Sequence, residues 1–169
     1  LEEWKNSRRR KPLLLPGVRQ CGKTYVLKEF GRNSFRNTCY INFEESNQIR
    51  SVFDFDFNIL RIIREIELIK GQKITAGETL VIFDEIQECP KAITSLKYFC
   101  ENMKELHLVC AGSLLSVAIK RDNISFSVGK VNRMQMYPMN FKEFLTALGH
   151  EGYIELFTDW SVHRPVPDL

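Results

Sequence analysis

An apolar run followed directly by a glycine-rich loop constrains the fold of this chain more than any other feature. Residues 13–15 are three leucines, and residues 17–24 read GVRQCGKT, which matches the pattern Gly-x-x-x-x-Gly-Lys-[Ser/Thr] at every fixed position. Such a segment ends a strand, turns with its backbone N–H groups facing inward, and opens a helix whose positive N-terminus meets an anion. The pattern therefore predicts a strand, a phosphate-binding loop and a helix, in that order.

The fixed residues of the loop have separate predicted tasks. Gly17 and Gly22 permit the turn and the close approach of phosphate oxygens, which Cβ atoms would obstruct. Lys23 is expected to reach the β- and γ-phosphates of a nucleoside triphosphate, and the Thr24 hydroxyl to ligate Mg²⁺. The candidate nucleotide-binding residues are Gly17, Val18, Arg19, Gln20, Cys21, Gly22, Lys23, Thr24 and Tyr25.

Apolar runs and amphipathic segments alternate along the chain, which predicts an α/β fold with right-handed crossovers. We expect a three-layer sandwich around a mostly parallel five-stranded sheet. The expected strands are residues 11–15, 38–43, 79–83, 106–111 and 134–137. The expected helices are residues 25–30 ending at Gly31, one or two between 48 and 69 with a break at 54–58, then 91–104, 114–119 and 141–148.

Length and composition are those of one globular domain. The chain has 169 residues, of which 44% are hydrophobic and 27% charged. We expect residues 1–150 to form the core and residues 151–169 to begin a truncated lid or C-terminal region. Because the chain opens at Leu1 and ends in a polar tail with prolines, we expect it to be part of a longer protein.

Charge and cysteine content suggest a cytoplasmic protein without a membrane span. Five cysteines form no C-x-x-C pair, which favours reduced thiols, and no apolar stretch approaches the ~18 residues that a span requires. The net charge of +3 favours no particular partner. A local basic run, Lys5 with residues 8–11, has two interpretations: a solvated segment, or a contact with the phosphates of DNA or of a nucleotide.

An acidic pair follows one of the predicted strands, which is a continuous apolar run. Asp84 and Glu85 come directly after residues 79–83, at the end where open α/β sheets bind ligands. There Asp84 is expected to hold Mg²⁺, usually through water, and Glu85 to polarise the water that attacks the γ-phosphate. The alternative is that the pair only caps the helix beginning near Pro90. Gln87 is a further candidate for contact with the same water.

The predicted strand at 106–111 also ends in small polar residues. Ser113 follows Gly112 at the ligand edge, where it is a candidate sensor of the γ-phosphate or of the attacking water. Equally, Gly112 and Ser113 could turn the chain and cap the following helix. Both interpretations of Ser113 stay open from sequence alone.

Four segments together resemble one family. They are residues 12–24, residues 81–87 (VIFDEIQ), residues 111–113 (AGS) and residues 125–144. They are similar to prokaryotic ATPases of the AAA superfamily, in which an AAA module precedes a C-terminal domain. The resemblance implies an AAA/ASCE-type P-loop NTPase fold and ATP with Mg²⁺ as cofactors. It also implies that Lys23, Glu85 and Ser113 act in catalysis and that Thr24 and Asp84 hold the metal.

The chain departs from that family in the segment after residue 124. Lys130 stands where members usually have arginine, and Ser127 stands where proline is common. An arginine finger can be worth ~10³ to 10⁵ in turnover because its planar fork spans two phosphate oxygens. We therefore expect slow hydrolysis by this chain alone.

The leading hypothesis is an ATP-binding, Mg-dependent ATP-hydrolysing module that powers or switches its own C-terminal effector domain. One alternative is a nucleotide-gated interaction protein with little turnover. Another is a DNA-associated ATPase that uses the basic run before residue 12. A homo-oligomer and DNA are accordingly kept as candidate partners, and a metabolite kinase is disfavoured by the acidic pair.

Overall fold

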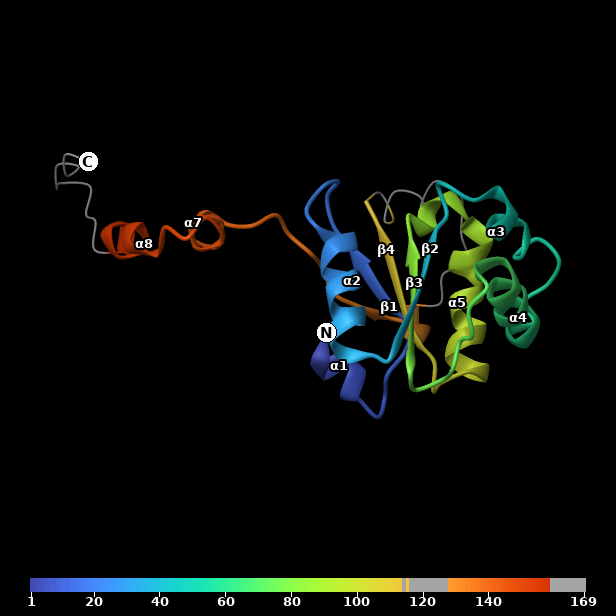
Figure 1. Cartoon of the computed structure of the whole chain (residues 1–169). Coiled ribbons are helices and arrows are strands. Elements are labelled where there is room, and N and C mark those ends of the chain that lie inside the picture. Colours follow the sequence, from blue (N-terminus) through green and yellow to red (C-terminus); the bar gives the residue numbers. More distant parts are fainter. Residues whose placement is uncertain (114, 116–127, 159–169) are drawn as a thin grey trace. The chain divides into compact units, whose positions relative to one another are not determined.

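The computed structural model describes residues 1–113, 115 and 128–158 (Figure 1). The chain divides into two compact units, Leu1–Tyr137 and Pro138–Leu169. Apart from Leu115, the helix expected at residues 114–119 lies outside the described residues.

The first unit is built on a five-stranded parallel sheet. Its order is β2-β3-β4-β1-β5, with every pair of neighbours parallel. Because β4 lies between β1 and β3, the strand that leads into the loop and the strand that ends in the acidic pair are separated by one strand. This confirms the predicted fold class. The strands are β1 (Leu13–Pro16), β2 (Asn37–Asn42), β3 (Thr79–Asp84), β4 (His107–Gly112) and β5 (Asn132–Arg133).

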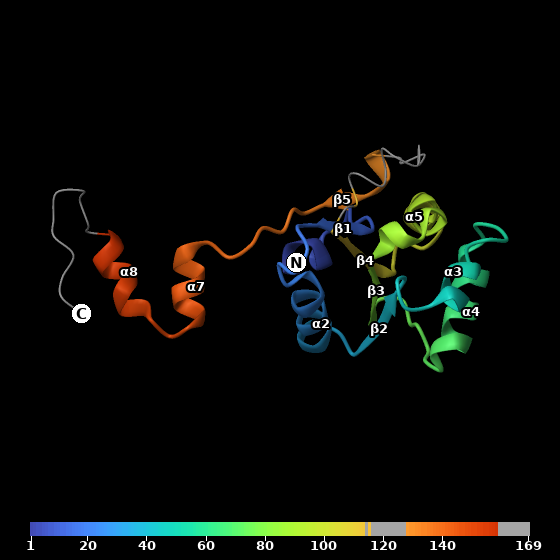
Figure 2. The same cartoon turned by 90° about the horizontal axis from the view of Figure 1, so that it is seen from above.

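Helices cover both faces of this sheet, which gives three layers (Figures 1 and 2). One face carries α1 (Glu2–Asn6) and α2 (Lys23–Ser34), and the other carries α3 (Asn47–Ser51), α4 (Ile59–Lys70) and α5 (Pro90–Asn102). Two short 3₁₀ turns complete the described elements of this unit, η1 (Ile86–Glu88) and η2 (Val128–Lys130).

Strand β3 is buried on both sides because both faces are covered. Leu80 and Ile82 pack in the cluster with α1 and α2, whereas Val81 and Phe83 pack in the cluster with α3, α4 and α5. All six residues of the strand are buried, as its continuous apolar run predicts. Side chains alternate along a strand, so Asp84 lies on the same face as Ile82, which is the face of α2.

The first helix is longer than the sequence predicts. Gly31 was expected to end it, but α2 continues to Ser34 and Gly31 is buried within it. A Cβ at Gly31 would overlap the side chain of Thr38 in β2. The glycine therefore lets α2 pack closely on the sheet, which is a tertiary requirement that a local pattern does not reveal.

The fifth strand begins two residues before its predicted position at 134–137. Parallel pairing to β1 nevertheless continues beyond Arg133, because Met134 N donates to Leu14 O and Met136 N donates to Pro16 O, each at 2.9 Å. The pair of helices predicted between 48 and 69 is present as α3 and α4, and the predicted break at 54–58 separates them.

The second unit contains α7 (Phe141–Ala147) and α8 (Glu151–Thr158). A capping box opens α7, since Asn140 Oδ1 accepts from Glu143 N at 3.0 Å and Asn140 N donates to Glu143 Oε2 at 2.8 Å. The sequence predicts α7 but not α8. Of the helices in the described ranges, none is long and apolar enough to cross a bilayer.

His107, the first residue of β4, gives the first unit a pH-dependent stability. Its ring packs edge-on against Trp4 and Phe35, with centroids 5.9 and 4.8 Å away. Burial, and then the charge of Arg10, lower the pKa of His107 from 6.5 to about 4. Between these two values the unfolded chain binds a proton that the folded chain does not, so stability falls as pH falls through this range.

We expect the free energy of unfolding to fall by on the order of 1 to 3 kcal/mol between pH ~7 and pH ~4.5 because of His107. Urea titrations at the two pH values, on the wild type and on His107→Phe, measure this. The phenylalanine variant keeps the aromatic packing and is expected to lose that part of the pH dependence. An equal loss of stability in both proteins would contradict the assignment.

Candidate functional site

The loop between β1 and α2 contains two residues with left-handed backbone. Gln20 has φ 63° and Gly22 has φ 91°, and Gly22 is the N-cap of α2. Left-handed residues in such turns bring successive backbone N–H groups to one side, where they form an anion-binding concavity. The positive end of the α2 dipole lies at the same place. The local geometry is thus that of an anion-binding loop.

Gly17 is required by a close approach from the segment after β5. It forms a parallel bridge with Met136. A Cβ at Gly17 would lie 2.7 Å from the Met136 carbonyl oxygen and 3.0 Å from Cys21 Sγ. Since the nearest atom belongs to the backbone, any side chain at residue 17 would displace either the loop or the strand beside it.

Lys23 directs its ammonium group back into the loop. Its Nζ donates to the carbonyl oxygens of Gly17 at 3.1 Å and Val18 at 2.8 Å, and lies 4.0 Å from Cys21 Sγ. Only 5% of the residue is exposed. A buried ammonium needs such acceptors, so the loop and Lys23 stabilise each other.

Four of the candidate nucleotide-binding side chains face solvent instead. Val18 is 54% exposed and Tyr25 71% exposed, and Arg19 and Gln20 are also exposed. The loop backbone and the Lys23 ammonium, and not these four side chains, are the groups that the structure places inside the loop. Nucleotide binding by these side chains stays a prediction.

Thr24 and Asp84 meet although they are 60 residues apart in the chain. The Thr24 hydroxyl donates to Asp84 Oδ2 at 2.6 Å. The contact arises because Thr24 lies in the first turn of α2 and the side chain of Asp84 lies on the α2 face of the sheet. Asp84 is only 2% exposed, and Glu85 N also donates to its Oδ1 at 3.0 Å. Sequence reasoning named both residues as metal ligands, and the fold brings them together.

Tyr40 is a third partner of Asp84, and the sequence analysis missed it. Its hydroxyl donates to Asp84 Oδ2 at 2.9 Å. Burial, and next the hydrogen bond to Asp84, raise the pKa of Tyr40, so its hydroxyl stays protonated and can only donate to the carboxylate. Lys28 of α2 lies over the Tyr40 ring, 3.7 Å from its centroid. Tyr40 lies on the α2 face because it pairs in register with Ile82, and the sequence alone does not give that pairing.

Glu85 turns away from the strand directly after Asp84. Its φ is 48°, a left-handed value that costs a residue with a side chain on the order of 1 to 3 kcal/mol. The half-buried carboxylate accepts from Gln87 Nε2 at 2.5 Å through its Oε2. The backbone turn and this hydrogen bond orient a carboxylate at the carboxyl edge of the sheet, next to the buried Asp84.

Gly112 leaves the space that Gln87 occupies. A Cβ at Gly112 would overlap Gln87 Oε1, and that oxygen is buried with no hydrogen-bond partner among the described residues. An unpaired buried acceptor is costly, so Gln87 can accept a further hydrogen bond there. Gln87 therefore contacts both Glu85, which follows β3, and Gly112, which ends β4.

Ser113 lies at the same edge, one residue past β4. The register pairs Pro16 with Gly112, so Gly17 and Ser113 are the next residues of two neighbouring strands. The side chain of Ser113 is half-buried and makes no hydrogen bond within the described part of the chain. The position is compatible with the predicted sensor, and the role itself stays a prediction.

Lys130 lies elsewhere. It ends η2, just before the amino end of β5, and its Nζ forms an ion pair with Glu101 Oε1 of α5 at 2.9 Å. The hydrogen bond to Glu101 raises the pKa of Lys130. The phosphate loop, by contrast, follows the carboxyl end of β1. Lys130 therefore lies at the other edge of the sheet from the candidate nucleotide site of its own chain.

The AAA domain family matches residues 9–145. A Walker-type ATPase of Pyrococcus abyssi has a TM-score of 0.58 and 17% sequence identity over 95% of this chain and 58% of its own. The ORC2 protein of Aeropyrum pernix, solved in ADPNP and ADP complexes, has a TM-score of 0.51 and 12% identity over 86% of this chain and 46% of its own. The comparison with curated proteins found no match.

These similarities differ in what they establish. At identities of 17% and 12%, the two solved structures show a shared fold and no more. The chain spans 58% and 46% of their lengths, so their complete architectures extend beyond what this chain contains. The family match covers the phosphate loop, the acidic pair and Ser113 together, and it confirms the resemblance to AAA-superfamily ATPases.

Proposed function

This chain belongs to the AAA domain family, and on that premise we propose that it binds Mg-ATP at residues 17–24 and hydrolyses it to drive or switch an effector domain. One observation carries the proposal. The hydrogen bond of 2.6 Å between Thr24 and Asp84 joins the end of the phosphate loop to the acidic strand end. A helix cap or a chance glycine turn would not require these two side chains to meet.

Phosphate binding uses the backbone of the loop and Lys23. The N–H groups at the start of α2 and the helix dipole favour the negative charge of the β-phosphate. A phosphate in the loop offers the Lys23 ammonium stronger acceptors than the carbonyl oxygens that hold it now, because hydrogen bonds between charged groups are about twice as strong as neutral ones.

Thr24 and Asp84 would hold Mg²⁺. Their hydroxyl and carboxylate oxygens are the hard ligands that this ion prefers, and Tyr40 and Glu85 N keep Asp84 oriented toward Thr24. When bound, the ion neutralises charge that develops on the phosphate oxygens.

Glu85 is the proposed general base. Its carboxylate accepts a proton from water while the water oxygen bonds to the γ-phosphorus and the bond to the β-phosphate oxygen breaks, which gives ADP and phosphate. Gln87 positions the carboxylate through its hydrogen bond. Ser113 at the neighbouring strand end would donate to the γ-phosphate or to this water.

Nucleotide gating without appreciable turnover is the second candidate function. It is favoured by Lys130, which stands at the position of the family's arginine and is paired with Glu101 rather than free. We further propose that turnover by this chain is slow and that a second copy or a C-terminal effector domain completes the activity. We also propose that the core ends near residue 150 and that the protein is cytoplasmic.

Removing the charge of Asp84 tests the metal site. We expect Asp84→Asn to weaken the Mg²⁺-dependent part of ATP affinity about 10- to 100-fold, and to leave binding of ATP in EDTA unchanged, because only the metal needs the carboxylate charge. Fluorescence titration with a labelled ATP analogue, with and without Mg²⁺, measures both terms.

The matched control is Asp54→Asn, which removes the same charge from a surface ion pair with Lys91. It is expected to behave as wild type. If the wild type shows no binding, the proposed function is wrong. If Asp84→Asn keeps the full Mg²⁺ dependence, the assignment of the metal ligands is wrong.

A further inference from the structure

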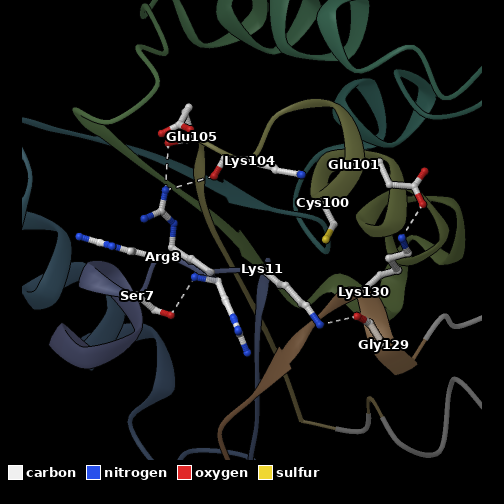
Figure 3. Close-up of a pocket in the computed structure, with 11 residues that line it drawn as sticks. Ser7, Arg8, Lys11, Cys100, Glu101, Lys104, Glu105, Gly129 and Lys130 are labelled. Carbon is white, nitrogen blue, oxygen red and sulfur yellow. Dashed lines mark hydrogen bonds and ion pairs between the residues drawn. The ribbon is translucent and has the colours of Figure 1, made fainter.

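A basic cavity lies at the edge of the sheet opposite to the phosphate loop. It has a volume of about 820 Å³ and is lined by the segment between α1 and β1, the end of α5, the turn before β4, and η2 (Figure 3). These segments precede the amino ends of β1, β4 and β5. Residues 11 and 17 are separated by the length of β1, roughly 20 Å at ~3.3 Å per residue, so the cavity and the nucleotide site are distinct.

The fold gathers positive charge here from distant parts of the chain. Among the described residues, six cationic side chains and two carboxylates, Glu101 and Glu105, line the cavity, which gives this part of its lining a net charge of +4. The whole chain, in contrast, carries only +3. The cationic residues are Arg8, Arg9, Arg10, Lys11, Lys104 and Lys130.

Three of the six cations are fixed by the protein itself. Arg10 donates to the carbonyl oxygens of Lys5, Lys104 and Glu105 at 2.8 to 3.3 Å. Lys11 Nζ donates to Gly129 O at 2.6 Å, and Lys130 pairs with Glu101. These contacts connect the four segments around the cavity and neutralise Glu101.

The other three cations have no such partners. The side chains of Arg8, Arg9 and Lys104 make no hydrogen bond or ion pair within the described ranges, and all three residues are exposed. Figure 3 shows Arg8 and Lys104 on separate segments that border the cavity. A site with three unpaired cations around a fixed basic floor suits a ligand that carries several phosphates.

We propose that this cavity binds the phosphate backbone of duplex DNA. Among the described residues that line it none is aromatic, so they offer no stacking platform of the kind that single-stranded bases use. Contacts from arginine and lysine to phosphates alone give binding that is strong at low salt and independent of sequence.

The proposal is tested with the triple variant Arg8→Gln, Arg9→Gln, Lys104→Gln and a labelled random-sequence duplex, by fluorescence anisotropy between about 50 and 200 mM KCl. Each lost phosphate contact lowers the steepness of the plot of log affinity against log salt by ~0.9. We expect the slope to become shallower by about three and affinity at the lowest salt to fall at least about tenfold.

The matched control replaces three exposed cations outside the cavity, Arg32→Gln, Arg64→Gln and Lys70→Gln, which gives the same net charge. It should keep the wild-type slope. Lys23→Ala should also bind DNA as wild type does, so a failure of ATP binding would leave this result intact.

Three outcomes would overturn the proposal. The first is a triple variant with the wild-type slope, and the second is a control variant that loses as much affinity as the triple variant. The third is displacement of the duplex by inorganic tripolyphosphate or polyglutamate at a lower charge concentration than unlabelled duplex requires, which would make the cavity a small-anion or acidic-peptide site.

Discussion

Glu85→Gln is expected to reduce ATP turnover by about 10²- to 10⁴-fold while Mg-ATP affinity stays within about threefold of wild type. The amide cannot accept the proton of the attacking water, so the chemical step loses its base. The geometry should survive, because the carbonyl oxygen of the new side chain can still accept the hydrogen bond from Gln87. Phosphate release under single-turnover conditions and nucleotide titration measure the two quantities separately.

Glu88→Gln provides the matched control. It makes the same chemical change three residues later, at an exposed position in η1, and is expected to hydrolyse ATP as wild type does. Equal turnover in wild type and Glu85→Gln would contradict the assignment of the base. If wild-type turnover is itself negligible but ATP binds, the gating function is favoured over hydrolysis.

The phosphate loop and the acidic pair could be predicted because their requirements are local. Gly22 must adopt a left-handed φ, Lys23 must follow it, and a buried strand must end at Asp84. Each of these requirements concerns residues that are adjacent in the sequence. The structure brings Thr24 and Asp84 into contact, and their role as metal ligands stays a prediction.

Other parts of the site depend on strand order and could not be predicted. Tyr40 reaches Asp84 because β2 pairs with β3 in a register that places Tyr40 beside Ile82. Gln87 fills the space that Gly112 leaves at the end of β4. Neither contact follows from the pattern of apolar residues in the sequence, because each joins residues that become neighbours only when the sheet has formed.

The role of the basic run also could not be predicted from sequence alone. Its sequence allowed a solvated segment or a phosphate contact, and nothing in the run chose between them. The fold places Lys104 and Lys130 against residues 8–11 and ties Arg10 and Lys11 to carbonyl oxygens. The positive charge around the cavity therefore arises from tertiary structure. It could not be inferred from the net charge of the whole chain, which is small.

Lys23→Ala is expected to weaken Mg-ATP binding at least about 100-fold. Each charge-assisted hydrogen bond is worth about 1.5 to 3 kcal/mol, and in the proposed function Lys23 makes one to each of two phosphates. Lys28→Ala is the control, since it removes an exposed lysine of the same helix that lies over Tyr40 and outside the loop. Circular dichroism establishes that both variants are folded.

Calorimetric titration of Mg-ATP into the wild type, Lys23→Ala and Lys28→Ala tests the central claim most directly. We predict saturable binding of one nucleotide per chain in the wild type and in Lys28→Ala, and its loss in Lys23→Ala. Equal binding by wild type and Lys23→Ala, or no binding by the folded wild type, would contradict the conclusion that residues 17–24 form a working nucleotide site.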